Sequence, residues 1–146
     1  MHNLLAIETS EETCSAALYS AGDCTELFES EPRKHSELIL PMIDRLMAEA
    51  GLQRSSLDAV AFGRGPGSFT GVRIATAVAQ GIGFALDIPV VPVSTLQALA
   101  QGAFRQAGAR SVLAAHDARM QELYWGEFSM HEELKQPVGE EMVVCL

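Results

Sequence analysis

Short apolar runs separated by polar turns occupy the first 30 residues of the chain. The runs lie at residues 4–7, 14–19 and 26–30, with a polar segment at 8–13 and the turn signal Ala21-Gly22-Asp23 between them. Strands joined by such tight turns are typical of an antiparallel meander. The pattern therefore predicts that the chain opens with three antiparallel strands.

Apolar residues recur at helical spacing between residues 36 and 50, which predicts the first helix. Ser36 is the expected N-cap, and Gly51 is expected just past the C-terminal end. Pro41 marks the true start of this helix or bends its first turn. The apolar stripe is wide enough to contact more than one neighbouring element.

From residue 59 onward, strands alternate with helices. Apolar runs at 59–62 and 90–93 are typical of buried strands, and the spacing of apolar residues predicts helices over 72–86 and 94–108. Strands connected through a helix pair in parallel by right-handed crossovers. Together with the opening meander, this predicts a mixed sheet flanked by helices.

The third predicted helix has recognisable ends. Ser94 is expected to cap it, Gln97 to complete a capping box, and Gly108 to end it. Its expected buried face consists of Leu96, Leu99, Ala100, Ala103, Phe104 and Ala107.

The strand pattern begins again near residue 111. Residues 112–116 and 122–128 resemble strands on either side of a turn at 117–121, which repeats the strand–turn–strand order of the N-terminus. We therefore predict a first domain over residues 1–110 and the start of a second, incomplete domain over residues 111–146.

The helix predicted at 72–86 is apolar around most of its circumference. Its polar residues Arg73, Thr76 and Gln80 form one narrow stripe. Two interpretations stay open: a central helix buried within its own domain, or a helix packed against another subunit. For the second, the candidate interface combines this helix with the helix at 36–50 and consists of Leu38, Met42, Leu46, Val72, Arg73, Ala75, Thr76, Ala79 and Gln80.

A glycine-rich loop, Gly63-Arg64-Gly65-Pro66-Gly67-Ser68-Phe69-Thr70-Gly71, joins a predicted strand to this helix. It matches neither the P-loop nor the dinucleotide-binding pattern, because the lysine of the first and the glycine spacing of the second are missing. The loop is an anion cradle or a tight connection that packs against a neighbour. Together with the first turn, the candidate anion-binding residues are Glu8, Thr9, Ser10, Gly65, Gly67, Ser68, Thr70 and Gly71.

Charge and composition narrow the choice of partners. The 146 residues carry 10 Lys and Arg against 19 Asp and Glu, a net charge of −9, so we do not expect the chain to bind nucleic acid by itself.

No apolar run approaches the ~20 residues of a membrane span, and residues 1–7 lack the basic start of a secretory signal. Cys14, Cys24 and Cys145 form no CxxC pair, which favours plain thiols over a redox site and a cytoplasmic location.

No residue stands out as catalytic. Ser68 lies outside a G-x-S-x-G elbow and has no evident base, so we expect it to cap the following helix. His35, His116 and Asp117 could form a metal site only if the fold brought them together, since their sequence spacing does not indicate one. We therefore expect no metal site. No two histidines have the spacing of a helical metal site; they are His2, His35, His116 and His131.

Several segments, taken in order, resemble motifs of the TsaB (YeaZ) family. The most specific is the glycine-rich loop followed by Val72-Arg73, and the resemblance extends over residues 4–128. The other segments are Leu4-Leu5-Ala6-Ile7-Glu8-Thr9-Ser10, Lys34-His35-Ser36-Glu37 with Pro41, Val93-Ser94-Thr95-Leu96, and Asp117-Ala118-Arg119-Met120 with Glu122-Leu123-Tyr124-Trp125.

The resemblance implies an α/β fold of the actin-like ATPase type (ASKHA, ribonuclease H-like), with a mixed five-stranded sheet flanked by helices. It implies a non-catalytic scaffold or activator that pairs with the transferase TsaD and the ATPase TsaE to make N6-threonylcarbamoyladenosine (t6A) in tRNA. In the family, helices of the first domain form the contact with TsaD. Family members are longer and have a complete second domain.

The resemblance implies no required cofactor and leaves weak ATP or ADP binding open. Glu8 stands where actin-like kinases place an acidic residue near magnesium, yet residues 8–13 contain no Lys or Arg, and Glu11 and Glu12 would repel a triphosphate. The alternative function is an ATP-binding enzyme or a peptidase-like hydrolase of the same fold. Alone, the chain is expected to form a homodimer, and tRNA contact is expected mainly through the partner.

Overall fold

The computed structural model describes residues 2–145. Within this range the chain divides into two compact units. Unit 1 comprises residues 2–64 and 68–92, and unit 2 comprises residues 65–67 and 93–145. Each unit has its own sheet and its own hydrophobic core.

Unit 1 contains a sheet of β1 (Leu4–Glu8), β2 (Cys14–Ser20), β3 (Asp23–Glu29), β4 (Ala59–Gly63) and β5 (Val90–Val93). The strand order is β3-β2-β1-β4-β5. β1 pairs antiparallel with β2 and parallel with β4, and β2 pairs antiparallel with β3. The predicted mixed five-stranded sheet, with its opening meander, is therefore confirmed.

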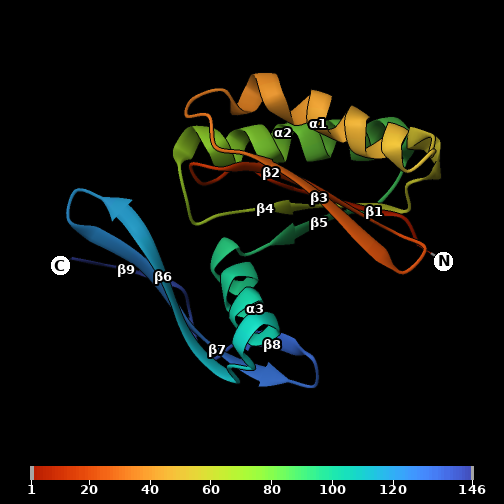
Figure 1. Cartoon of the computed structure of the whole chain (residues 1–146). Coiled ribbons are helices and arrows are strands. Elements are labelled where there is room, and N and C mark those ends of the chain that lie inside the picture. Colours follow the sequence, from red (N-terminus) through yellow and green to blue (C-terminus); the bar gives the residue numbers. More distant parts are fainter. Residues whose placement is uncertain (1, 146) are drawn as a thin grey trace. The chain divides into compact units, whose positions relative to one another are not determined.

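Two helices, α1 (His35–Glu49) and α2 (Phe69–Leu86), cover the same face of this sheet (Figure 1). The single turn η1 (Arg54–Ser56) lies between α1 and β4 in the chain. Alternate strand residues point toward the helices, as the period of two in a strand requires. The core of unit 1 includes Leu5, Ile7, Ala16, Leu18 and Val60 from the sheet and Ile39, Ile43, Leu46 and Met47 from α1.

The start of α1 differs from the prediction. The N-cap is Lys34 and not Ser36, and no side chain caps this end. His35 already belongs to the helix, because the Leu38 amide donates to the carbonyl oxygen of Lys34 at 3.0 Å, and the buried ring of His35 bonds the carbonyl oxygen of Glu11 through Nε2 at 2.7 Å. Pro41 lies inside the helix, and Gly51 adopts the expected positive φ, +65°, just past the end.

Unit 2 contains α3 (Thr95–Ala107) and a sheet of β6 (Ser111–Arg119), β7 (Glu122–His131), β8 (Leu134–Pro137) and β9 (Met142–Cys145). β7 is central: β6 pairs along one edge, and β8 and β9 pair with different stretches of the other, all antiparallel. α3 packs on this sheet by placing Leu96 and Ala100 against Ala114 and Phe128.

The boundary between the units differs from the predicted 110/111 division, because α3 shares its core with β6 and β7 and so belongs to unit 2. The buried face of α3 is also narrower than predicted, since Leu99 is 52% exposed. Ser94 does cap α3 by accepting from the Gln97 amide. The Gln97 side chain forms no capping-box hydrogen bond with the Ser94 amide; its Nε2 donates to the carbonyl oxygen of Lys135.

α2 begins at Phe69, earlier than the predicted start at residue 72. Among residues 2–145 it is the one helix whose length and composition would allow it to cross a membrane. Its residues Gly71, Ala75, Ala79 and Gly83 are nevertheless buried in unit 1, which is the arrangement of a helix that covers a sheet.

Candidate functional site

The side of α2 that faces the sheet is made of small residues. Gly71, Ala75, Ala79 and Gly83 recur every fourth position and are all buried. A Cβ atom on Gly71 would lie 1.9 Å from the carbonyl oxygen of Thr9, and one on Gly83 would lie 2.3 Å from Val90 Cγ2. The small residues therefore let the backbone of α2 approach the sheet closely.

Part of the predicted interface lies in this inner layer. Met42 and Leu46 of α1 and Ala75 and Ala79 of α2 are between 0% and 7% exposed and belong to the core of unit 1. A partner cannot reach these side chains, so their assignment to an interface is corrected. Of the remaining predicted residues, Arg73 and Gln80 are exposed, whereas Leu38, Val72 and Thr76 are half-buried.

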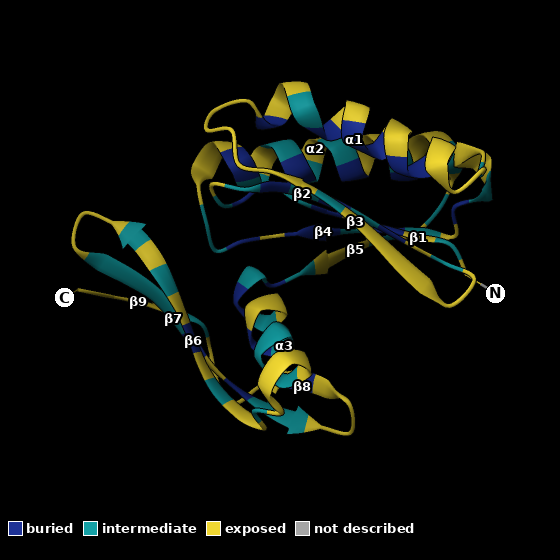
Figure 2. Cartoon of the chain, in the orientation of Figure 1, coloured by how far each residue is buried: buried dark blue, intermediate teal, exposed yellow. Residues whose placement is uncertain are grey.

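The opposite side of α2 is exposed and largely apolar. Phe69 is 72% exposed and Phe84 is 93% exposed, although both are large hydrophobic side chains. Figure 2 shows buried and exposed positions alternating along both helices. We call this surface the outer face of α2; it consists of Phe69, Arg73, Ala77, Gln80, Gly81 and Phe84.

Sequence reasoning missed Phe69 and Phe84 as surface residues. The candidate interface above does not include Phe84, and Phe69 falls in the glycine-rich loop by sequence. The signal was available in the helical period, because positions 69, 73, 77, 80 and 84 lie on one side of a helix and positions 71, 75, 79 and 83 on the other. Because the small residues face the sheet, the phenylalanines on the opposite side of the helix must face outward.

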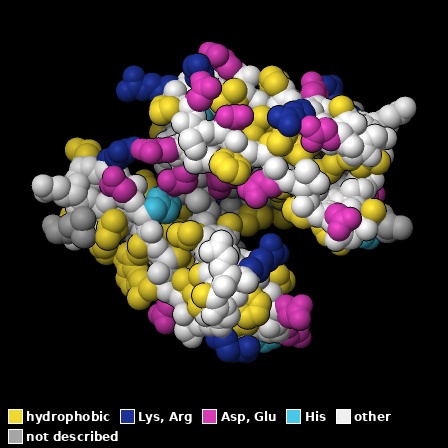
Figure 3. Space-filling view, viewed as in Figure 1, with side chains coloured by type: hydrophobic (Ala, Val, Ile, Leu, Met, Phe, Trp, Pro, Cys, Tyr) yellow, Lys and Arg dark blue, Asp and Glu magenta, His cyan; other side chains and the backbone are white. Residues whose placement is uncertain are grey.

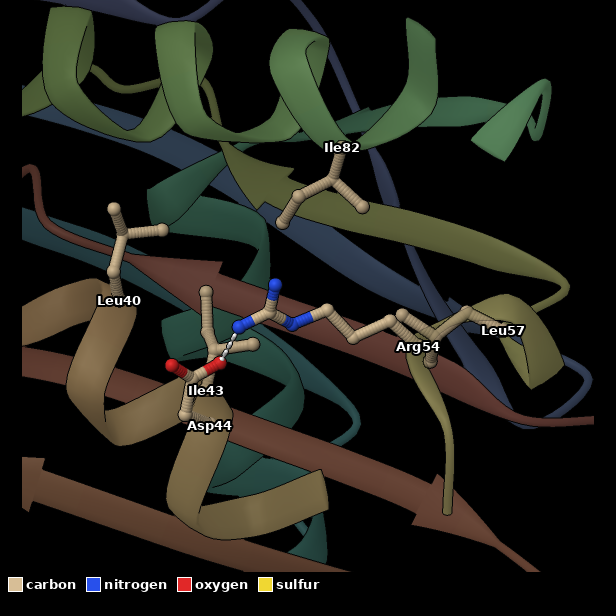
Figure 4. Close-up of a pocket in the computed structure, with 6 residues that line it drawn as sticks. All are labelled: Leu40, Ile43, Asp44, Arg54, Leu57 and Ile82. Atoms are coloured by element: carbon tan, nitrogen blue, oxygen red, sulfur yellow. Dashed lines mark hydrogen bonds and ion pairs between the residues drawn. The ribbon is translucent and has the colours of Figure 1, made fainter. Parts of the chain in front are cut away.

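A shallow groove of about 190 Å³ lies between α1 and α2. Figure 4 shows Leu40 and Ile43 of α1 approaching Ile82 of α2, with Leu57 beyond η1 closing one end. The Arg54 side chain extends across the view toward Asp44 of α1 and forms an ion pair with it. Leu40 is 52% exposed, so the groove offers an apolar surface beside the outer face of α2.

The turn after β1 is fastened to the start of α2. The Thr9 hydroxyl donates to the carbonyl oxygen of Gly71 at 2.6 Å, and the Ser68 amide donates to the carbonyl oxygen of Ser10 at 2.7 Å. Ser68 Oγ accepts from the Gly71 amide, which confirms Ser68 as the N-cap. The Ser10 amide donates to a Glu8 carboxylate oxygen at 2.7 Å.

The structure therefore brings together five of the eight candidate anion-binding residues, Glu8, Thr9, Ser10, Ser68 and Gly71, all within unit 1. Thr9 and Ser10 are buried, and the hydroxyls of Thr9 and Ser68 are already bonded to α2. Thr70 is exposed, and Gly65 and Gly67 belong to unit 2. In unit 1 their hydrogen bonds join the turn after β1 to the start of α2.

The remaining polar groups to consider are the potential metal ligands and two residues whose pKa values are shifted. Among residues 2–145, no three His, Cys, Asp or Glu side chains are grouped so that they could hold a metal ion. Burial, followed by the nearby charge of Glu29, raises the pKa of the Cys14 thiol, which keeps it protonated beside Met42. Burial also lowers the pKa of Lys135, whose ammonium group donates to the carbonyl oxygen of Arg110.

Comparison with known proteins places this geometry in a family. Residues 29–145 match the family model described as TsaD, tRNA N6-adenosine threonylcarbamoyltransferase. The "tRNA threonylcarbamoyladenosine biosynthesis protein TsaB" of Haemophilus influenzae is 49% identical over 94% of this chain and 58% of its own length. The protein of the same name from Escherichia coli is 48% identical over 88% of this chain and 56% of its own length. The chain thus spans a little over half the length of these relatives.

The fold agrees with a solved structure of the same kind. YeaZ from Pseudomonas aeruginosa is 50% identical and superposes with a TM-score of 0.96, covering 99% of this chain and 68% of that protein. The likeness confirms the actin-like, mixed α/β fold that the sequence motifs implied. These findings show that the chain belongs to the TsaB (YeaZ) family.

Proposed function

We propose that this chain is a subunit of the machinery that makes t6A in tRNA, and that it acts there as a scaffold or activator. The observation that carries the proposal is the 49% identity, along 94% of the chain, to a protein named for t6A biosynthesis.

A non-catalytic role is supported by the way the glycine-rich loop is used. The hydroxyl of Ser68 in the loop and that of Thr9 in the turn after β1 both form hydrogen bonds to Gly71 at the start of α2. Ser68 is therefore proposed to be structural, and Ser68→Ala is expected to leave t6A formation within about twofold of the wild type while costing about 1 kcal/mol of stability. A large loss of t6A from a folded Ser68→Ala protein would favour the hydrolase alternative.

The outer face of α2 and the adjacent groove are proposed to bind a TsaD-type transferase subunit. Because this chain itself matches the family model of that transferase, the two subunits would share a fold and could present equivalent helices to each other. Without the transferase, the same apolar surface would lead to a homodimer. A TsaE-type ATPase is the proposed third component.

The tRNA is proposed to contact the transferase more than this chain. The net charge is −9, and acidic side chains are spread over the face shown in Figure 3. Phosphate binding requires clustered Lys and Arg. We propose a cytoplasmic location and no required cofactor, with weak ATP or ADP binding as the most that the loop would support.

The test is reconstitution of t6A formation. Unmodified tRNA, ATP and a threonylcarbamoyl donor are incubated with the TsaD-type and TsaE-type subunits of the same organism, with and without this chain, and t6A is measured by mass spectrometry. The proposal predicts t6A only when the chain is present. Equal t6A in its absence would contradict the proposal.

A further inference from the structure

Arg73 is the one charged residue within α2, and it lies on the otherwise neutral outer face. Its neighbours on that face are Phe69, Ala77, Gln80, Gly81 and Phe84. A surface of this composition buries well against a partner, except at the arginine. Arg73 is therefore the one position on this face that a partner could not bury favourably without supplying an anion.

The guanidinium group is held in a defined place. Its Cζ lies 3.3 Å from the centroid of the Phe69 ring, and Nη1 donates weakly to the carbonyl oxygen of Phe69 at 3.3 Å. Stacking on an aromatic ring restrains the group and leaves N–H donors at its edge unused. A planar, restrained guanidinium has the geometry that receives a carboxylate through two parallel hydrogen bonds.

Three other cations on or beside these helices are already paired. Lys34 bonds Glu31, Arg45 bonds Glu49 at 2.7 Å, and Arg54 bonds Asp44. No carboxylate among residues 2–145 forms an ion pair with Arg73. The paired cations have no need of an external anion, whereas Arg73 does once a partner removes it from water.

We infer that Arg73 is a specificity-determining residue, whose guanidinium receives an Asp or Glu side chain from the facing helix of the TsaD-type subunit. This inference rests on the proposed function and deepens it. A partner helix with no carboxylate opposite Arg73 would bury the guanidinium group unpaired, which costs binding free energy. Arg73 would therefore disfavour incorrect partners as well as attract the correct one.

Other anions fit the position less well. A tRNA phosphate would find one cation among apolar side chains on a chain of net charge −9, whereas nucleic acid requires several. In a homodimer through the same face Arg73 would stay unpaired, because α2 of the second copy has no acidic residue before Asp87 at the C-cap. The surrounding apolar surface favours a protein helix.

The experiment measures the affinity of this chain for the TsaD-type subunit at low and high salt by isothermal titration calorimetry. Arg73→Gln removes the charge, Arg73→Lys keeps it without the planar fork, and Arg105→Gln removes an exposed arginine near the end of α3 as the matched control. Arg73→Gln is expected to weaken binding at least about tenfold and to flatten the salt dependence. Arg73→Lys should recover part of the loss, and Arg105→Gln should bind like the wild type.

The Phe84→Asp variant separates this inference from the proposed function. If Phe84→Asp abolishes binding while Arg73→Gln binds within about twofold of the wild type, the arginine inference is overturned and the proposed interface stands. If neither change affects binding, the interface itself is wrong. If Arg73→Gln reduces tRNA retention by the complex but not its assembly, the arginine receives a phosphate and the inference is overturned.

Discussion

At the scale of single residues, two glycines of α2 have opposite surroundings. Gly71 faces the carbonyl oxygen of Thr9, where a Cβ atom would lie 1.9 Å away, whereas Gly81 has no atom within 4 Å of that position. The first glycine allows the helix to be fastened to the turn after β1. The second has no packing role in unit 1.

Gly71→Ala and Gly81→Ala form a matched pair that tests this difference. Gly71→Ala is expected to destabilise the protein by about 2 kcal/mol or more, because the backbone of Thr9 must move. Gly81→Ala is expected to stabilise it by about 0.5–1 kcal/mol through helix propensity. Urea unfolding followed by circular dichroism measures both, and equal effects would contradict the close approach of α2 to the turn.

Lys135 is the residue whose titration should affect stability. Its side chain is buried, and desolvation together with Arg110 lowers its pKa. The folded state therefore releases this proton at a lower pH than the unfolded state, so stability should rise as the pH increases from the lowered pKa toward the ordinary value for lysine, about 10.4.

Lys135→Met keeps the apolar stem and removes the titrating group. The rise in unfolding free energy with alkaline pH should become smaller in this variant, whereas Lys34→Met at an exposed position should retain the rise. Chemical unfolding at a series of pH values from about 7 to about 10 compares them. The same alkaline rise in Lys135→Met would show that another group causes it.

At the scale of elements, α2 has an inner face that stabilises unit 1 and an outer face available to a partner. Ala79 is fully buried, and Ala77 is exposed two residues earlier. Ala79→Glu should therefore cost several kcal/mol, because it buries an unpaired carboxylate. Ala77→Glu should change stability by less than about 0.5 kcal/mol.

Thermal unfolding of both variants tests the assignment of the two faces. A folded Ala77→Glu protein with reduced affinity for the transferase would place the interface on the outer face. If Ala77→Glu were strongly destabilised and Ala79→Glu were as stable as the wild type, Ala77 and not Ala79 would face the sheet, which would contradict the assignment.

Local patterns predicted most elements, since their information lies in neighbouring residues. The run at 90–93 coincides with β5, and Ser68 and Ser94 cap their helices as expected. The start of α1 could not be predicted, because it depends on the contact between His35 and the distant carbonyl group of Glu11. The exposure of Leu99 likewise depends on how α3 lies on its sheet.

At the scale of the whole molecule, the fold was predictable and the extent of each unit was not. Apolar periodicity indicates where strands and helices occur, yet α3 could pack with the strands before it or after it. Leu96 and Ala100 contact Ala114 and Phe128, which assigns α3 to unit 2. The same limit applies to the candidate site, because Ala75 and Arg73 were both predicted interface residues of one helix and only packing separates buried Ala75 from exposed Arg73.

The most direct test of the proposed interface is the mass of the complex formed with the TsaD-type subunit, measured by light scattering after size exclusion. The wild-type chain should form a stable complex at micromolar concentration. Phe84→Asp on the outer face of α2 should abolish it, while Leu99→Asp, which alters an exposed leucine of α3, should leave it intact. A complex that survives Phe84→Asp, or one that depends on Leu99, would contradict the proposal that the outer face of α2 binds the transferase.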